Sequence, residues 1–294
     1  MKYLFVMAII ILTYGEMRAQ CDCMQASAAS ASAMIGGTPD AGVLGRGKLR
    51  LAGYYRFIDG AAKYRETEIA EPYEMSYYAK FVGFSAAYGI SGKLTIEGEA
   101  GWFTERGDYG LGAYSGEGFS HVGVSGKYNI LSSREYGIEW TAGLGAKLPI
   151  GQSGVENEYT FGYDLGVFSS YYGGILHSFL HRKFDGGVHL FLISRADFNF
   201  ESTDSGLVNP INVYRNSLFA TKEFWRDMFA AAELRWVESR GRYIYISPQL
   251  GVRRHEFSIS ASFDIPLYEH SEFESMDIRT SFAINLVWQP SLAE

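Results

Sequence analysis

The sequence lacks several features that would place it in large classes of protein. It contains no long basic run, and its net charge of −7 with a pI near 5.5 argues against a nucleic-acid partner. Helical periodicity is almost absent. Proline is scarce, with 7 residues, whereas Gly 34, Tyr 21, Phe 20 and Trp 5 are high counts. These counts favour an aromatic- and glycine-rich β protein over a helical one.

Long apolar runs are missing beyond the first residues. An apolar run extends from Leu4 to Tyr14 after Lys2, and Ala19 and Gln20 then precede a segment of small residues, as in a secretory signal peptide. This run is too short to cross a bilayer, and nothing later offers the roughly 18 apolar residues of a transmembrane helix. The sequence therefore predicts an exported chain with a signal peptide over residues 1–20, and not an inner-membrane helical protein.

Cysteine is nearly absent too, and both cysteines lie just past the expected cleavage point. Lipidation of Cys21, a disulfide or thiol pair with Cys23, and a soft-metal site with Met24 compete with a flexible start that holds no site. The residues before Cys21 lack the leucine usual for lipidation, and cysteines one residue apart would form a strained ring. Copper(I) suits two thiolates and a thioether, but no third cysteine or histidine cluster accompanies them. We expect no cofactor.

Strict alternation of polar and apolar residues marks residues 243–270. In its second half, odd positions are apolar and even positions are polar; the apolar set is Phe257, Ile259, Ala261, Phe263 and Ile265, and the polar set is Ser258, Ser260, Ser262 and Asp264. A strand puts alternate residues on opposite faces, so the segment has one apolar face. Residues 243–253 alternate likewise, and the pair predicts an antiparallel hairpin. A soluble β-sandwich would show the same alternation, so the hairpin alone does not decide which solvent the apolar face meets.

Further strand patterns follow Lys48, and twelve strands are predicted. Their expected ranges are 48–58, 75–89, 93–104, 117–130, 135–148, 173–183, 187–200, 213–224, 228–238, 243–253, 256–268 and 276–288. Short connections, such as 90–93 and 131–134, alternate with mostly longer ones, such as 105–116 and 149–172. This segregation is typical of bacterial outer-membrane barrels with both termini on the periplasmic side. The predicted fold is all-β, a transmembrane antiparallel up-and-down β-barrel of about 12 strands.

The lengths and faces of the predicted strands agree with a barrel in lipid. About 9 to 11 tilted residues cross a bilayer, and in lipid no sheet edge can stay open. Charges fall on the polar face, as a lumen predicts, since a lipid-facing charge at the midplane costs about 2 to 4 kcal/mol. In the strand at 187–200, Phe191 and Ile193 alternate with Leu190 and Leu192, which a partly apolar lumen would explain. Aromatic residues near strand ends fit interfacial girdles, namely Tyr54, Tyr55, Tyr77, Tyr78, Trp102 and Trp288.

Four stretches resemble a known family. They are KLRLAGYYRF at 48–57, AAYGISGKLTIEG at 86–98, GLGAKLPIGQSG at 143–154 and YIYISPQLGVRRHEFSISASFDIPLYEH at 243–270. They resemble the outer-membrane β-barrel family assigned to transport in the phenol meta-degradation pathway. The resemblance implies a barrel of about twelve strands in the outer membrane of a Gram-negative bacterium, passage of small, aromatic or hydrophobic molecules, and no catalytic residues. The end of the chain departs from the usual barrel ending, because QPSLAE follows Trp288 where a terminal aromatic residue is common.

The leading hypothesis is therefore a transporter or channel whose lumen is lined by charged side chains of both signs. The candidates for lumen or solute contacts are Arg50, Arg56, Glu97, Glu99, Lys127, Glu139, Lys147, Arg195, Asp197, Arg215, Glu233, Arg235, Arg253 and Asp264. Expected partners are outer-membrane lipid, a small-molecule solute and the barrel assembly machinery. Residues 21–47 form a flexible segment before the barrel at 48–294, and they either lead in without order or fold into the lumen as a plug.

Three alternatives remain open. Metal-linked transport would use Cys21, Cys23 and Met24, and a purely structural barrel would need no solute. An outer-membrane lipid hydrolase would need a serine, a histidine and an acidic partner within hydrogen-bond reach. His177 and Ser178 are adjacent, so a strand would point them to opposite faces, and no G-x-S-x-G turn is present. We therefore expect that the protein is not an enzyme.

Overall fold

The fold is described from a computed structural model, which covers residues 42–64, 74–108, 113–133, 137–148, 154–157, 172–200, 212–225, 227–238, 241–271 and 274–290. The strands in these ranges are β1 (Leu49–Tyr64), β2 (Glu74–Ser91), β3 (Leu94–Asp108), β4 (Ala113–Ser133), β5 (Ile138–Leu148), β6 (Gly154–Asn157), β7 (Tyr172–Lys183), β8 (Val188–Phe200), β9 (Val213–Trp225), β10 (Met228–Glu238), β11 (Gly241–Arg254), β12 (Phe257–Ser271) and β13 (Glu274–Trp288). Within the same ranges, no helix is long and apolar enough to span a membrane.

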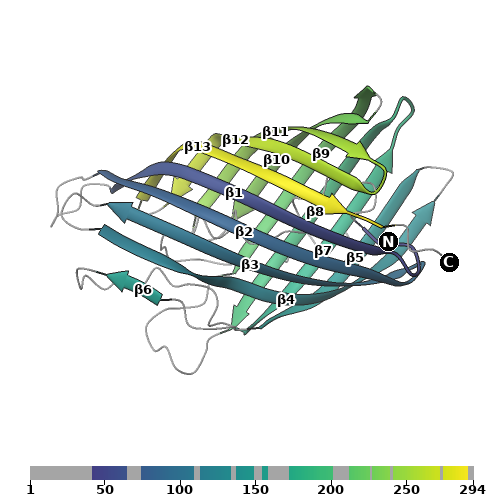
Figure 1. The fold of residues 1–294 in the computed structure, drawn as a ribbon, viewed down its shortest axis with the longest axis horizontal. Helices are drawn as coiled ribbons and strands as arrows, with labels where there is room; N and C mark the ends of the chain where they lie inside the picture. The colour runs from purple at the N-terminus through teal and green to yellow at the C-terminus, as the bar shows by residue number, and fades with distance from the viewer. Residues whose placement is uncertain are drawn as a thin grey trace, which may run out of the picture.

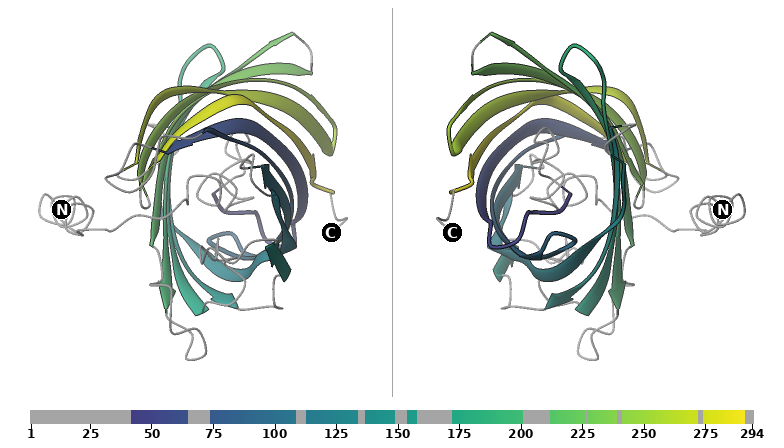
Figure 2. Two further views of the ribbon diagram at one scale, coloured as in Figure 1. Left: turned by 90° about the vertical axis from the view of Figure 1, so that its left-hand side faces the viewer. Right: turned by 90° about the vertical axis from the view of Figure 1, so that its right-hand side faces the viewer.

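Twelve of these strands close into one antiparallel barrel (Figure 1). Each barrel strand pairs with the next one along the chain, with β5 pairing to β7, and β1 pairs with β13 to complete the ring. Viewed along its axis, the barrel is a ring of strands around a lumen (Figure 2). The predicted fold class is therefore confirmed, and the sandwich alternative is excluded because a closed ring leaves no second sheet.

The strand β6 was not predicted, since residues 149–172 were expected to form one long connection. It pairs with the end of β4, where Tyr114 lies opposite Asn157 and Glu117 lies opposite Gly154. The reason is the unequal length of neighbouring strands. β4 has 21 residues, whereas β5 has 11 and ends opposite Val122, so the remainder of β4 offers a backbone edge that β6 can use.

The two faces of the barrel wall differ sharply in exposure. Outward-facing apolar side chains are widely exposed, such as Leu144 at 70%, Leu250 at 61% and Ile259 at 53%. Inward-facing charged side chains such as Arg50 and Arg195 are 2% and 3% exposed. An exposed apolar wall with paired backbone throughout is stable in lipid and not in water. The alternation read from the sequence therefore points the apolar face toward a bilayer and the polar face toward the lumen.

One of the expected girdle residues faces the other way. Tyr54 was predicted at the membrane interface, but it faces the lumen, is 5% exposed and stacks on Phe81 with ring centroids 5.2 Å apart. The error arose because Tyr54 and Tyr55 are adjacent and only one of two neighbours in a strand can face outward. The position opposite Tyr54 on β2 is Gly83, whose missing side chain leaves room for the tyrosine ring.

The residues before β1 fold back into the barrel. Leu44 is 1% exposed, and its backbone N–H donates to Oγ1 of Thr95, a lumen-facing residue of β3, over 2.8 Å. The N–H of Gly47 donates to the carbonyl of Gly89 over 2.8 Å, and the N–H of Gly89 donates to the carbonyl of Lys48 over 2.9 Å. Residues 42–48, which we call the lead-in segment, therefore adhere to the inner wall.

Candidate functional site in the barrel lumen

The predicted lumen charges come from nine strands, and the alternation along each strand points their side chains toward a shared interior. They lie on β1 (Arg50, Arg56), β3 (Glu97, Glu99), β4 (Lys127), β5 (Glu139, Lys147), β8 (Arg195, Asp197), β9 (Arg215), β10 (Glu233, Arg235), β11 (Arg253) and β12 (Asp264). All but Glu139 and Arg253 have side chains that are nine-tenths buried or more. Burial on this scale is tolerated only where charges are paired and hydrogen-bonded.

The first group of charges joins β1, β3 and β4, so it reaches across β2. Glu97 accepts a hydrogen bond from Nη2 of Arg50 over 3.0 Å and another from Nζ of Lys127 over 2.8 Å, through the same carboxylate oxygen. One carboxylate is thus shared by two cations, so this group carries a net positive charge.

The second group crosses the barrel. Both oxygens of Glu99 accept from the guanidinium of Arg195, over 2.5 and 3.0 Å. Arg195 is on β8 and Glu99 is on β3, with β4, β5 and β7 between them, so the ion pair is a chord across the lumen. Nε of Arg195 also donates to Asp197 over 3.0 Å, and Nζ of Lys147 lies 3.3 Å from the same carboxylate.

The third group surrounds Asp264. Its carboxylate accepts from Arg56 and Ser247, from Nη2 of Arg235 over 2.5 Å and from Oγ of Ser281 over 2.8 Å. Each arginine reaches Asp264 from two strands away in the ring. A carboxylate with four donors from β1, β10, β11 and β13 holds that part of the wall together.

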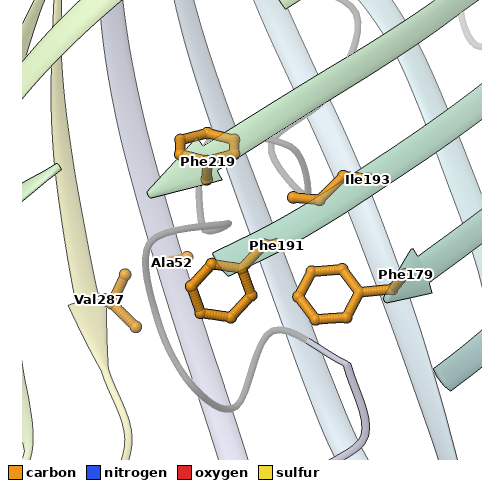
Figure 3. Close-up of a cluster of buried hydrophobic side chains, with 6 residues drawn as sticks. All are labelled: Ala52, Phe179, Phe191, Ile193, Phe219 and Val287. Atoms are coloured by element: carbon orange, nitrogen blue, oxygen red, sulfur yellow. The ribbon is translucent and has the colours of Figure 1, made fainter. Parts of the chain in front are cut away.

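An apolar cluster lies next to these charges. Its members are Ala52, Phe179, Phe191, Ile193, Phe219 and Val287, and each is at most 7% exposed (Figure 3). The rings of Phe179 and Phe191 are 5.7 Å apart. Ala52 is on β1, opposite β8 in the ring, so the cluster narrows the lumen across its diameter. It lies on the short-turn side of the charges, because β8 begins at Val188 and reaches Phe191 before Arg195.

The two less buried candidates lie near the short turns. The side chain of Glu139 is 47% exposed, with Oε2 3.7 Å from Nδ1 of His181. Nε2 of His181 is 2.9 Å from Nδ1 of His189, and the imidazole ring of His181 stacks on Phe191 at 4.6 Å. Arg253 donates to Glu223 over 2.8 Å. These two predicted residues are therefore separate from the three central groups.

The sequence reasoning missed the aromatic part of the lumen. Phe179, Phe191, Phe219 and Tyr245 all face inward. For Phe191 a signal existed, because Phe191 and Ile193 alternate with Leu190 and Leu192; in the structure the first pair is buried and Leu192 is 43% exposed. A partly apolar lumen is the physical cause of that blurred alternation. Phe219 gave no comparable signal.

The described residues bear on two of the alternative functions, the lipid hydrolase and metal-linked transport. His177 and Ser178 are consecutive residues of β7 and so face opposite sides of the wall, and Oγ of Ser178 accepts from the indole N–H of Trp140 over 3.2 Å. Cys21, Cys23 and Met24 lie outside the described residues. Across the ranges that are described, no group of three or more His, Cys, Asp or Glu residues could hold a metal ion.

The fold and the lumen together define a class, the closed membrane β-barrels. No protein-family model matches the sequence, and no curated protein matches it. Among solved structures, the chain is similar to the COG4313 outer membrane channel from Pseudomonas putida F1, with a TM-score of 0.63, 12% identity, and coverage of 86% of this chain and 99% of that one. It is also similar to the translocator domain of autotransporter NalP from Neisseria meningitidis, with a TM-score of 0.49, 11% identity, and coverage of 91% and 97%. At 12% identity, the likeness to the COG4313 channel supports the fold alone.

Proposed function

We propose that this protein is a channel of the bacterial outer membrane that passes small molecules of aromatic or hydrophobic character. The observation that carries the proposal is the closed twelve-strand barrel with an apolar outer wall and a lumen lined by charged and aromatic side chains. A barrel of this size is wider than eight-stranded barrels filled by side chains and narrower than open porins of 16 to 18 strands. A narrow, side-chain-gated passage suits it.

The aromatic character of the solute is inferred from the lumen wall. The apolar cluster places three phenylalanine rings where a solute must pass toward the short-turn side. Aromatic rings favour aromatic solutes through offset and edge contacts.

We further propose that the lead-in segment acts as a plug. Leu44 enters the interior beside Thr95, and a Cβ on Gly42 would lie 3.1 Å from Oγ1 of Thr141 and 3.3 Å from the ring of Phe179. Thr141 is on β5 and Phe179 is on β7, so the segment reaches across from β3 toward the apolar cluster. The lead-in segment and the apolar cluster would therefore obstruct the same stretch of the lumen.

The test is planar-bilayer conductance of the refolded mature barrel beside a version that lacks residues 21–47. We expect low conductance from the mature chain and a steady rise after deletion, since the deletion removes Leu44 from the lumen. Equal conductance would show that the segment is no plug. Silence from both, with folding established by heat-modifiable gel migration, would overturn the channel proposal itself and favour a structural barrel.

A further inference from the structure

The strongest unexplained feature of the lumen is a concentration of arginine at one level. Arg195 on β8 and Arg215 on β9 are directly opposite each other in the strand register. Like charges at directly opposed positions are destabilising. Arg215 is also within electrostatic reach of Arg56 and Arg235, with Glu233 as the nearby carboxylate. We call Arg56, Arg195, Arg215 and Arg235 the arginine layer; each is at most 4% exposed.

The arginine layer lies next to the apolar cluster on three strands. The inward positions run from Arg195 to Ile193 and Phe191 on β8, from Arg215 through Ser217 to Phe219 on β9, and from Arg56 through Tyr54 to Ala52 on β1. Two residues along a strand advance about 7 Å. Phe191 and Phe219 are four residues from the arginines of their own strands, but Phe179 on β7 lies opposite Ile193, two residues from the level of Arg195. That spacing matches a benzene ring joined to a carboxylate, so one small molecule can touch the guanidinium of Arg195 and the ring of Phe179 together.

We propose that the lumen binds small aromatic carboxylates, with the carboxylate in the arginine layer and the ring against the apolar cluster. The inference rests on the proposed function, because it names the class of solute that the same lumen passes. Guanidinium groups match carboxylates with paired N–H donors, and they also stack on aromatic rings. The structure contains an example of the second contact, since Cζ of Arg235 lies 5.3 Å from the ring centroid of Tyr245.

A solute carboxylate can reach Arg195 by displacing Glu99. The Glu99 carboxylate crosses the lumen to occupy the guanidinium of Arg195, which also holds Asp197. When a solute carboxylate replaces Glu99, Arg195 stays fully paired and the Arg195–Glu99 ion pair that crosses the lumen is broken. This exchange leaves the buried guanidinium of Arg195 with an acceptor, and the displaced carboxylate of Glu99 stays within electrostatic reach of the Lys147 ammonium.

The experiment compares benzoate with benzamide, which has the same shape and no charge. Binding to the refolded mature barrel in detergent is measured by isothermal titration calorimetry. We expect benzoate to bind at least about tenfold more tightly, because hydrogen bonds between charged groups exceed those of a neutral amide by roughly that factor. Equal affinity for both probes, or binding of neither, would overturn the inference.

Variants locate the site. Arg215→Gln should weaken benzoate binding about tenfold and leave benzamide unchanged, while Arg215→Lys, which keeps the charge, should restore part of the loss. Glu99→Gln should tighten benzoate binding, because the competing carboxylate is gone and Arg195 still pairs with Asp197. Arg254→Gln is the matched control, since Arg254 is the exposed last residue of β11, away from the arginine layer. An Arg215→Gln effect no larger than that of Arg254→Gln would exclude the arginine layer as the site.

Flux separates the two proposals. Proteoliposomes that pass benzoate faster than benzamide support both. If both probes pass equally fast, and faster than through empty liposomes, the channel proposal is supported and the preference for carboxylates is contradicted. If neither probe passes through a folded barrel that lacks residues 21–47, the channel proposal is contradicted.

Discussion

At the scale of single residues, several close contacts along the barrel wall are possible only because one of the two residues is glycine. A Cβ on Gly83 would lie 1.9 Å from the Tyr54 ring, and one on Gly251 would lie 2.3 Å from the Phe229 ring. Gly89 makes the closest approach to backbone, with a Cβ placed 2.0 Å from the carbonyl oxygen of Gly45. The lead-in segment can therefore lie on β2 only where β2 has glycine.

Replacing Gly89 with alanine should release the lead-in segment while the barrel still folds. The added methyl group would meet backbone of the segment, which has no flexible end to turn aside. Trypsin should then cleave after Arg46 several times faster than in the parent barrel. Gly92→Ala is the control, because a Cβ there meets nothing within 4 Å. Unchanged cleavage in Gly89→Ala would mean that the contact with β2 does not hold the segment.

Asp264→Asn should cost about 3 to 5 kcal/mol of unfolding free energy, because it removes the carboxylate that the buried Arg56 and Arg235 share. Glu223→Gln removes an acidic partner from Arg253, but the Glu223 side chain is 59% exposed, so the expected cost is about 1 kcal/mol or less. Urea unfolding in lipid vesicles, followed by tryptophan fluorescence, measures both. Similar losses in the two variants would contradict the role given to Asp264.

At the scale of elements, the alternation within each strand shows which of its faces is turned toward lipid. On β5, Leu144 and Leu148 are exposed, while Thr141 and Lys147 are buried. The same two-residue period holds on β10 and β11, whose register pairs outward Leu234 with Ile246 and inward Arg235 with Tyr245. Because neighbouring strands are in register, one apolar stripe continues into the next around the ring.

A charge placed on that stripe should destabilise the barrel according to depth. Leu144→Arg, in the middle of β5, should cost about 2 to 4 kcal/mol, because the guanidinium would enter the apolar interior of the bilayer. Leu131→Arg, two residues before the end of β4, should cost about 0 to 1 kcal/mol, since the side chain can reach the interface. Equal costs in urea unfolding would contradict the assignment of these faces to lipid.

At the scale of the whole molecule, the connections at one end of the barrel all have two to four residues (Figure 1). The other end has the long connections after β1, β5 and β8, beside two-residue ones after β10 and β12. The turn after β7 contains Asp185, and the connection from β8 to β9 contains Ser205. The pattern of outer-membrane barrels assigns short turns to the periplasm and long connections to the exterior.

Cysteine labelling tests this orientation. In a background with Cys21→Ser and Cys23→Ser, a membrane-impermeant maleimide added to intact cells should label Ser205→Cys and spare Asp185→Cys. Both should be labelled after the outer membrane is disrupted, which controls for reactivity. Labelling of Asp185→Cys alone in intact cells would reverse the orientation.

Much of the candidate site could be predicted because alternation is a local property. Any residue two positions from a known inward residue also faces inward, so Arg50, Glu97 and Lys127 could be assigned to the lumen one strand at a time. The exceptions arose where both faces are apolar, as on β8, or where two tyrosines are adjacent, as at Tyr54 and Tyr55. In both places a polar residue two positions away marks the inner side, Arg56 for Tyr54 and Arg195 for Ile193, so the same rule applied from those arginines would have assigned them.

The sequence by itself determined the class of fold, the twelve barrel strands without their exact ends, and the face of each charged candidate, because these follow from a period of two and from connection length. Only the tertiary structure decided which charges meet. Arg195 reaches Glu99 across the lumen, Asp264 gathers arginines from two strands away, and Ala52 approaches Phe191 from the opposite wall. Such contacts depend on position around a closed ring and on the stagger between strands, which no local pattern along the chain records.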